Sequence, residues 1–307
     1  MNEIILSTQR LTKKYKNTIA LDNASLEIRQ GEIYGLVGKN GAGKTTLLRL
    51  ITGQAFASNG SISLFGANSE AEINKQRRRI GAIIENPSFY SKLTAQQNLE
   101  YYRIQRGIPG SQAVMEALSE VGLADTDNKK YKSFSLGMKQ RLGLALALMN
   151  KPELLLLDEP INGLDPFGIV ELRNLLLKLN REKNITILIS SHILSELSSI
   201  ATDFGFINDG KLIRQMSAEE MSKECNKYIK LKVDKVEAMC ALLETQMGCT
   251  SYKVTPENAI HIYEHLDQPD AISEMAVRNG IRLYSIIVRD INLENYFIQM
   301  VGGEGNE

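Results

Sequence analysis

The segment "GKNGAGKT", residues 38–45, has the residue types and the spacing of a phosphate-binding loop. It fits the pattern G-x-x-x-x-G-K-[ST] and lies between a strand-like segment, "EIYGLV", and a helix-like one, "TTLLRLI". Glycines allow the backbone to turn its N–H groups toward an anion, and the N-terminus of the following helix adds about half a positive charge. The alternative is an unrelated glycine-rich turn, which the strand and helix on either side disfavour.

Two residues of this loop have side chains suited to phosphate chemistry. Lys44 is expected to reach the terminal phosphates of a nucleotide, and Thr45 is expected to bind Mg²⁺. Because Lys44 belongs to a loop, we expect its side chain at the surface. The expected nucleotide-binding residues are Gly38, Asn40, Gly41, Ala42, Gly43, Lys44, Thr45 and Thr46.

A second segment, "LLLLDEP" at residues 154–160, reads as a buried strand that ends in two acids. Asp158 can bind Mg²⁺ through water, and Glu159 can polarise an attacking water. Acids also end strands and cap helices for structural reasons, so this segment alone is ambiguous. Together with the phosphate loop it supplies the parts that phosphoryl transfer needs, which are positioning groups and charge stabilisation.

A third segment, "SFSLGMKQRLGLALALMN", begins at Ser133 and predicts a helix with an accessible N-terminus. Ser135 stands where an N-cap belongs, and Gly137 keeps the backbone accessible. The helix is apolar on most faces, which indicates burial, and a buried helix with an open N-terminus can bind an anion. An ordinary capped helix is the alternative, and this segment alone slightly favours it.

The elements around these motifs alternate between strand and helix. Residues 26–37 read as two strands joined at Gln30-Gly31, and residues 44–52 as a helix. Residues 154–157 and 185–189 read as buried parallel strands, with a helical pattern over 168–182 between them. This alternation predicts an α/β domain with a parallel sheet over residues 1–215.

The pattern changes near residue 216, where a smaller α+β domain, residues 216–307, is expected. Strand-like, helical and again strand-like segments follow one another in the order β-α-β-β-α-β, which resembles a ferredoxin-like unit. The short second strand is expected near 252–254, a last helix over 292–300, and a frayed tail after it.

Composition limits the classes of function. The chain has 307 residues, is 43% hydrophobic, and carries 36 basic and 36 acidic residues, so it lacks the basic excess of a general nucleic-acid binder. No apolar stretch approaches the ~20 residues that span a bilayer. The three cysteines show no metal spacing and suit a reducing compartment. We therefore expect a cytoplasmic protein that does not bind nucleic acid.

Taken together, the motifs resemble those of the ATP-binding subunits of ABC transporters over residues 1–215. Besides the phosphate loop and the acidic strand, "FSLGMKQ" is similar to the family signature and "NGLDP", with Asp165, to the loop after the catalytic acid. "SSH" matches the switch histidine at His192, and Tyr15 matches the aromatic residue that stacks on adenine.

The resemblance implies a fold and a mechanism. The fold would be that of a P-loop NTPase, with a RecA-like parallel sheet, an antiparallel β subdomain and a helical subdomain. Two copies would form a homodimer that encloses two ATP molecules with Mg²⁺. The phosphate loop of one copy would face Ser135 and Gly137 of the other, and His192 would contact the γ-phosphate. The subunit would lie on the inner face of the cell membrane, bound to a multi-span permease.

One residue departs from the family pattern. After the strand that begins "GAII", the family usually has a glutamine that touches Mg²⁺ and the attacking water, and this chain has Glu85. A carboxylate is a harder Mg²⁺ ligand than an amide, so Glu85 is a candidate catalytic and metal-binding residue. Its charge beside Asp158 and Glu159 would raise proton uptake among the three. Alternatively, Glu85 only caps the following turn.

The Glu85 departure, the signature variant and the extra C-terminal domain resemble the bacitracin-resistance and lantibiotic self-immunity transporters. The implied substrate is a membrane-active peptide antibiotic that is exported or removed from the bilayer. Aromatic residues after Glu85, beside a capping-box pattern at residues 94–97, form either subdomain core or a groove for a permease helix.

Three alternatives stay open. The chain could serve an exporter of another substrate, or it could be a soluble ABC ATPase acting on ribosomes or DNA. Soluble members of that kind usually carry two ATPase units or a long coiled coil, which this sequence lacks. The third alternative is a regulatory binding module, in which residues 216–307 sense a ligand.

Overall fold

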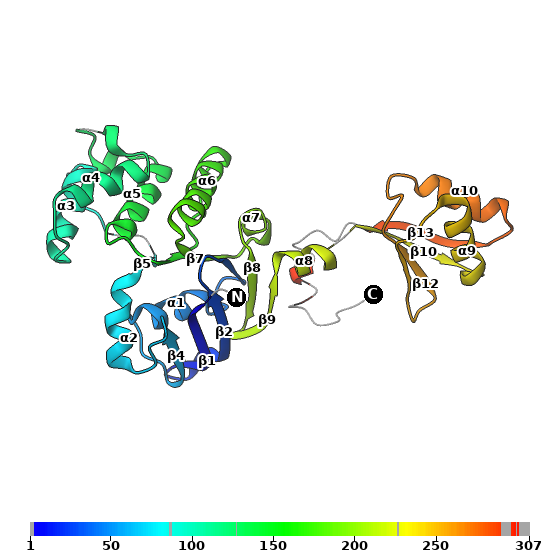
Figure 1. Cartoon of the computed structure of the whole chain (residues 1–307), viewed down its shortest axis with the longest axis horizontal. Helices are drawn as coiled ribbons and strands as arrows, with labels where there is room; N and C mark the ends of the chain where they lie inside the picture. The colour runs from blue at the N-terminus through cyan, green and yellow to red at the C-terminus, as the bar shows by residue number, and fades with distance from the viewer. Residues whose placement is uncertain are drawn as a thin grey trace. The chain divides into compact units, whose positions relative to one another are not determined.

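The computed structural model describes residues 3–85, 88–126, 128–225, 227–289, 296–298 and 300. The chain forms two compact units, Met1–Ala218 and Glu219–Glu307 (Figure 1). The sheet of the first unit continues past residue 215, the boundary expected from sequence, because its last strand runs to Ser217. Within the described residues, no helix has both the length and the apolarity needed to cross a bilayer.

A six-stranded sheet forms the centre of the first unit, in the order β5-β6-β7-β3-β8-β9. The first five strands are parallel, and β9 pairs antiparallel with β8. The run of leucines at 154–157 is fully buried, as expected for a strand covered on both faces. The strands are β3 (Ile33–Val37), β5 (Ile80–Ile83), β6 (Leu154–Asp158), β7 (Thr186–Ser191), β8 (Asp203–Asn208) and β9 (Lys211–Ser217).

A three-stranded antiparallel sheet, ordered β2-β1-β4, packs against this centre (Figure 1). Its strands are β1 (Ile4–Tyr15), β2 (Thr18–Arg29) and β4 (Asn59–Leu64). Leu6 and Leu26 of this sheet share one apolar core with Leu47 of helix α1 (Lys44–Thr52) and Leu156 of β6. The core therefore fixes the start of α1, and with it the phosphate loop, against the ends of the central strands.

One glutamine ties the two sheets together. Gln215 of β9 accepts hydrogen bonds at Oε1 from the hydroxyl of Tyr34, at 2.7 Å, and from the backbone N–H of Glu27, at 3.2 Å. Burial, reinforced by the charges of Asp203 and Glu32, raises the pKa of Tyr34, so its hydroxyl stays protonated and can donate. A single side chain thus joins β9 to β3 and β2.

The remaining helices of the first unit include a separate helical group, α3, α4 and α5 (Figure 1). Thr94 caps α3 through a complete capping box, since it accepts from the Gln97 N–H while Gln97 Oε1 accepts from the Thr94 N–H, as the sequence predicts. The helices are α2 (Glu70–Gln76), α3 (Ala95–Gln105), α4 (Gln112–Glu120), α5 (Leu136–Leu148), α6 (Pro166–Lys183) and α7 (Leu194–Leu197), with 3₁₀ turns at Arg77–Arg79, Ala124–Thr126 and Tyr131–Ser133.

The second unit contains an antiparallel sheet in the order β11-β12-β10-β13. Its elements follow the predicted β-α-β-β-α-β order, the connectivity of the ferredoxin-like motif. The predicted helix over 292–300 and the tail lie largely outside the described residues. After helix α8 (Ala218–Glu224), the elements are β10 (Tyr228–Val233), α9 (Val236–Met247), β11 (Tyr252–Val254), β12 (Ala259–Ile262), α10 (Pro269–Arg278) and β13 (Leu283–Arg289).

Candidate functional site

The glycine-rich loop connects β3 to α1 at the carboxyl end of the parallel strands. Gly43 has φ 109°, a left-handed conformation that side-chain-bearing residues rarely adopt, and a Cβ atom there would lie 2.6 Å from the Ala20 carbonyl. Only glycine fits this position. The loop and Glu159 line a small cavity of about 170 Å³, whose walls are Ala20, Asn40, Gly41, Gly43, Lys44, Thr45, Thr46 and Glu159.

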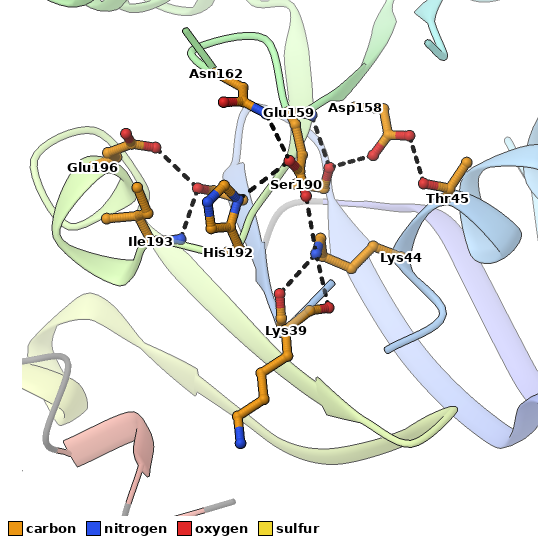
Figure 2. Close-up of polar contacts among 12 residues, drawn as sticks. Lys39, Lys44, Thr45, Asp158, Glu159, Asn162, Ser190, His192, Ile193 and Glu196 are labelled. Atoms are coloured by element: carbon orange, nitrogen blue, oxygen red, sulfur yellow. Dashed lines mark hydrogen bonds and ion pairs between the residues drawn. The ribbon is translucent and has the colours of Figure 1, made fainter. Parts of the chain in front are cut away.

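Lys44 is buried, with only 4% of the residue exposed, which corrects the expectation of a surface side chain. Its ammonium donates to the carbonyls of Gly38, at 2.7 Å, and Lys39, at 3.1 Å. It also lies 3.1 Å from Oε1 of Glu159 (Figure 2). A lysine ammonium has three donor positions, and these three acceptors can occupy all of them. The loop wraps around its own lysine, which is why the side chain is inside.

Asp158, at the end of β6, accepts hydrogen bonds on both carboxylate oxygens. Thr45 donates to Oδ2 at 2.7 Å, and Ser190 donates to Oδ1 at 2.6 Å (Figure 2). The parallel register of β6 and β7 places Ser190 directly beside Asp158. Sequence reasoning missed Ser190, although the quoted "SSH" begins with it. One hydroxyl and one carboxylate are hard oxygen donors, the set that holds Mg²⁺ when phosphates and waters complete its shell.

Glu159 follows Asp158 and holds its backbone at φ 45°, in the left-handed region. Its N–H donates to Ser190 Oγ at 3.0 Å, which keeps the turn in place. Oε2 lies 3.2 Å from Nδ1 of His192 and 3.4 Å from Nδ2 of Asn162 (Figure 2). Lys44 and His192, each expected from a separate motif, therefore both contact the carboxylate of Glu159, which was expected from a third. Asn162 was also missed, although it is the first residue of the segment "NGLDP".

The turn that carries His192 is held by its neighbours. Ser191 accepts a hydrogen bond from the Ile193 N–H and donates to Glu196, both at 3.0 Å (Figure 2). These bonds fix the chain on both sides of His192 where β7 leaves the sheet. The imidazole is about one-third exposed, so it remains accessible to a ligand that contacts Glu159.

Comparison with known proteins bears on what this arrangement does. A family model described as "ABC transporter" matches residues 21–162. The bacitracin transport ATP-binding protein BcrA of Bacillus licheniformis is 41% identical over 97% of this chain and 98% of its own length. The chain belongs to the ATP-binding subunits of ABC transporters. It is accordingly an ATPase subunit that binds ATP. ATPase cassettes of this family act as dimers with membrane permease components.

Two further similarities agree with this family. The lantibiotic transport ATP-binding protein SrtF of Streptococcus pyogenes is 44% identical over 68% of this chain and 89% of its own length. The solved dimer of the ATP-binding cassette MJ0796, bound to ADP and phosphate, covers 69% of this chain and 98% of its own, with a TM-score of 0.62 and 27% identity. The predicted P-loop NTPase fold, with its β and helical subdomains, is confirmed.

Three expected residues of this ABC subunit cap helices or follow a cap. Ser135 caps α5 by accepting from the Met138 N–H at 3.2 Å, and Asp165 caps α6 by accepting from the Gly168 N–H at 2.7 Å. A Cβ atom on Gly137 would meet only Leu164, at 3.8 Å, so the first turn of α5 is open. Within the described part of the chain, no hydrogen bond or ion pair joins these three to Lys44 or Glu159.

Among the described residues, Tyr15 and Glu85 make no hydrogen bond or ion pair with Asp158 or Glu159. Tyr15 ends β1 with 42% exposure, and the Lys13 ammonium lies 4.7 Å from its ring centre. Glu85 has φ 60°, a side chain 66% exposed, and an ion pair with Arg49 of α1. In the part of the chain that the structure describes, Glu85 therefore pairs with a cation on the helix that follows the phosphate loop, and its carboxylate is not shared with the candidate metal-site acids Asp158 and Glu159.

Proposed function

We propose that this ABC subunit powers the export of a membrane-active peptide antibiotic, or its removal from the bilayer, and so gives resistance or self-immunity. The observation that carries the proposal is the 41% identity to the bacitracin transport protein over 97% of this chain, which includes the C-terminal unit. The match to the lantibiotic transport protein points to the same class of substrate.

We infer the following roles at the site. The loop N–H groups and Lys44 bind the β- and γ-phosphates of ATP, and Thr45 with Asp158 holds Mg²⁺, which would neutralise phosphate charge. The γ-phosphate takes the place of Glu159 as partner of the Lys44 ammonium, because all three donor positions are already used. Glu159 then remains close to His192 and Asn162 and can polarise the attacking water.

The remaining expected site residues act, in our proposal, across a homodimer of this chain. Ser135, Gly137 and Asp165 of one copy meet the nucleotide bound to the loop of the other, and Tyr15 stacks on adenine. The open first turn of α5 supports this, since backbone N–H groups at a helix start attract phosphate. Glu85 contributes to the Mg²⁺ site only if its pair with Arg49 opens.

The permease contact is proposed at the aromatic group that follows Glu85. Tyr90 and Tyr101 are 48% and 43% exposed with ring centres 4.9 Å apart, and Tyr102 lies 5.4 Å from Tyr101. Exposed aromatic rings of this density suit an apolar helix of a partner. The subunit would then lie at the cytoplasmic face of the membrane, held there by a multi-span permease.

The test is antibiotic susceptibility in a sensitive bacterial host. The chain is expressed together with a candidate multi-span permease, and growth is measured in bacitracin and in a lantibiotic. We expect resistance to at least one, and its loss with Lys44→Ala in either case. If the host stays as susceptible to both peptides as it is without the transporter, while the purified complex hydrolyses ATP, the proposed substrate class would be wrong. The chain would then serve an exporter of another compound.

A further inference from the structure

A second cavity, larger than the nucleotide cavity, lies at the other end of the central strands. Its volume is about 860 Å³, within the range of small-molecule binding sites. Pro152 and Glu153 line it and lead directly into β6, and Ile185 lines it and leads into β7. The nucleotide cavity, by contrast, contains Glu159, which follows the carboxyl end of β6. Among the described residues the two cavities share no lining residue, so the larger one is a separate candidate site.

The walls of this larger cavity come from two parts of the first unit. Helix α4 of the helical group forms one wall, and the end of α6 with the segment that enters β7 forms another. Much of its apolar lining is buried, since Leu148, Met149 and Ile185 are each at most 8% exposed. Met115 of α4 also lines the cavity but is 44% exposed. Because a methionine side chain adapts to different shapes, it can pack against an apolar ligand.

Two acids of the larger cavity already have basic partners. Glu116 lies 2.9 Å from the Lys151 ammonium. Glu153 accepts two hydrogen bonds, each 2.6 Å long, from the guanidinium of Arg79, a residue outside the cavity lining. These bonds lower the pKa of Glu153, so its carboxylate stays ionised and paired. A cationic ligand would therefore have to compete with a lysine or an arginine for either carboxylate.

The third acid, Glu120, is shared by two lysines of α6. Lys183 donates a hydrogen bond to its Oε2, whereas the Lys178 ammonium lies 3.8 Å from its Oε1, beyond hydrogen-bond distance. Within the described residues, this buried Oε1 accepts no hydrogen bond. One carboxylate thus faces two ammonium groups, which leaves one positive charge in excess among the lining residues. The side chain of Lys178 is 51% exposed, so its ammonium can turn toward an anion.

We propose that the larger cavity binds a small anionic amphiphile, a molecule with one carboxylate and an apolar body. Its carboxylate pairs with Lys178, where positive charge is in excess, and its apolar body packs against Met115 and the buried apolar lining. The site is separate from the nucleotide cavity. Because its walls belong to α4 and α6, the bound molecule bridges the helical group and the helix that follows the catalytic loop.

The first test compares three ligands with the same apolar body and different head groups. Decanoate, decanol and decylammonium are titrated into the whole chain without nucleotide, each below its micelle concentration and solubility limit, and binding is measured by calorimetry. We expect decanoate to saturate one site per chain and to bind about 10-fold or more tightly than decylammonium, since it gains a charge-assisted contact. Decanol should lie between them. Decanoate that fails to saturate, or that binds no more tightly than decanol, would overturn the proposal.

Three variants locate the binding. Lys178→Gln is expected to weaken decanoate about 10-fold and to leave decanol unchanged. Arg181→Gln removes a positive charge from the same helix outside the cavity lining, so it is the matched control and should bind decanoate as the wild type does. Ala113→Phe fills part of the cavity and should weaken all three ligands. Binding of ATP checks that each variant is folded. Equal losses in Lys178→Gln and Arg181→Gln, or full decanoate affinity in folded Ala113→Phe, would overturn the proposal.

Discussion

The ammonium of Lys44 lies 3.1 Å from a carboxylate oxygen of Glu159. The phosphate loop and the end of β6 are therefore joined by an ion pair at the point where a nucleotide phosphate is expected to bind. The side chain of Lys44 is 4% exposed and that of Glu159 is 23% exposed, so water can replace a lost ion-pair partner more easily at Glu159 than at Lys44. A phosphate has to compete with Glu159 for the lysine, which gives the first two predictions opposite signs.

Replacing Lys44 by methionine keeps the apolar stem and removes the charge. Losing a charge-assisted contact to phosphate is expected to weaken ATP binding about 10- to 100-fold. Binding of a fluorescent ATP analogue measures this, and thermal melting verifies the fold. Lys39→Met is the control. It removes a neighbouring charge, but Lys39 contacts Lys44 through its backbone carbonyl and not through its side chain, so this variant should bind ATP normally. If Lys44→Met hydrolyses ATP at the wild-type rate, the assignment of residues 38–45 as the phosphate-binding loop would be wrong.

Replacing Glu159 by glutamine is expected to slow hydrolysis roughly 10²-fold or more, typical for loss of a general base. ATP affinity should hold or rise, because the competing carboxylate charge is gone. The variant should accumulate as an ATP-bound dimer, since closure precedes cleavage. Size-exclusion chromatography with and without ATP is the measurement. A variant that remains monomeric with ATP would count against the shared two-copy site.

Ser190→Ala removes a donor to Asp158 and an acceptor for the Glu159 N–H. Asp158 then loses one of the hydroxyls that orient it, so the Mg²⁺ concentration for half-maximal ATPase activity should rise several-fold. The buried hydrogen bonds also contribute stability, and unfolding should become easier by about 1 kcal/mol each. Ser191→Ala, whose hydroxyl contacts Glu196 instead, should leave the Mg²⁺ dependence unchanged. Equal shifts in both variants would contradict the proposed role of Ser190.

Glu85→Gln returns the residue that is usual in the family. Its pair with Arg49 is exposed on both sides, so the free energy of unfolding should change by less than about 0.5 kcal/mol. If Glu85 binds Mg²⁺, the variant needs more Mg²⁺ for half-maximal activity, whereas Arg49→Gln does not. If only the ion pair matters, the two variants behave alike. A Mg²⁺ titration of ATPase activity separates these outcomes, and unchanged titrations in both would remove Glu85 from the metal site.

Deleting residues 219–307 should leave ATP binding measurable, because every residue that lines the nucleotide cavity precedes residue 160. The cut after Ala218 keeps β9 intact, and therefore the Gln215 contacts. Dimer stability is expected to fall. Calorimetry with ATP gives the binding constant, and a folded truncation that fails to bind would show that the C-terminal unit completes the site.

The sequence predicts some elements far better than others, for physical reasons. The leucines at 154–157 are covered on both faces and give an uninterrupted apolar run, so β6 is evident. Strand β1 was not anticipated, because it is half exposed and its pairing with β2 shifts register several times, which breaks the alternation. The capping box at Thr94 was predicted because its partners are local in sequence.

At the site, the motifs identify groups but do not give their partners. Ser190 contacts Asp158 only because β6 and β7 pair in one register, and no spacing along the chain contains that information. Lys44 was expected outside because the motif describes a loop, and the inward turn of the carbonyls at Gly38 and Lys39 is a three-dimensional property. Glu85 was placed at the metal by analogy, and its contact with Arg49 depends on how α1 faces β5.

The contacts of Gln215 have a mechanical consequence. Strand β9 is the last strand before the chain leaves for the C-terminal unit, and Gln215 clamps it to Tyr34 on β3 and to Glu27 on β2. Strand β3 runs directly into the phosphate loop, and β2 carries Ala20 at the wall of the nucleotide cavity. A pull along β9 cannot slide the strand by one residue without breaking both bonds. Tension that the C-terminal unit exerts on β9 would thus be transmitted through the Gln215 amide to β2 and β3, the two strands that border the nucleotide cavity.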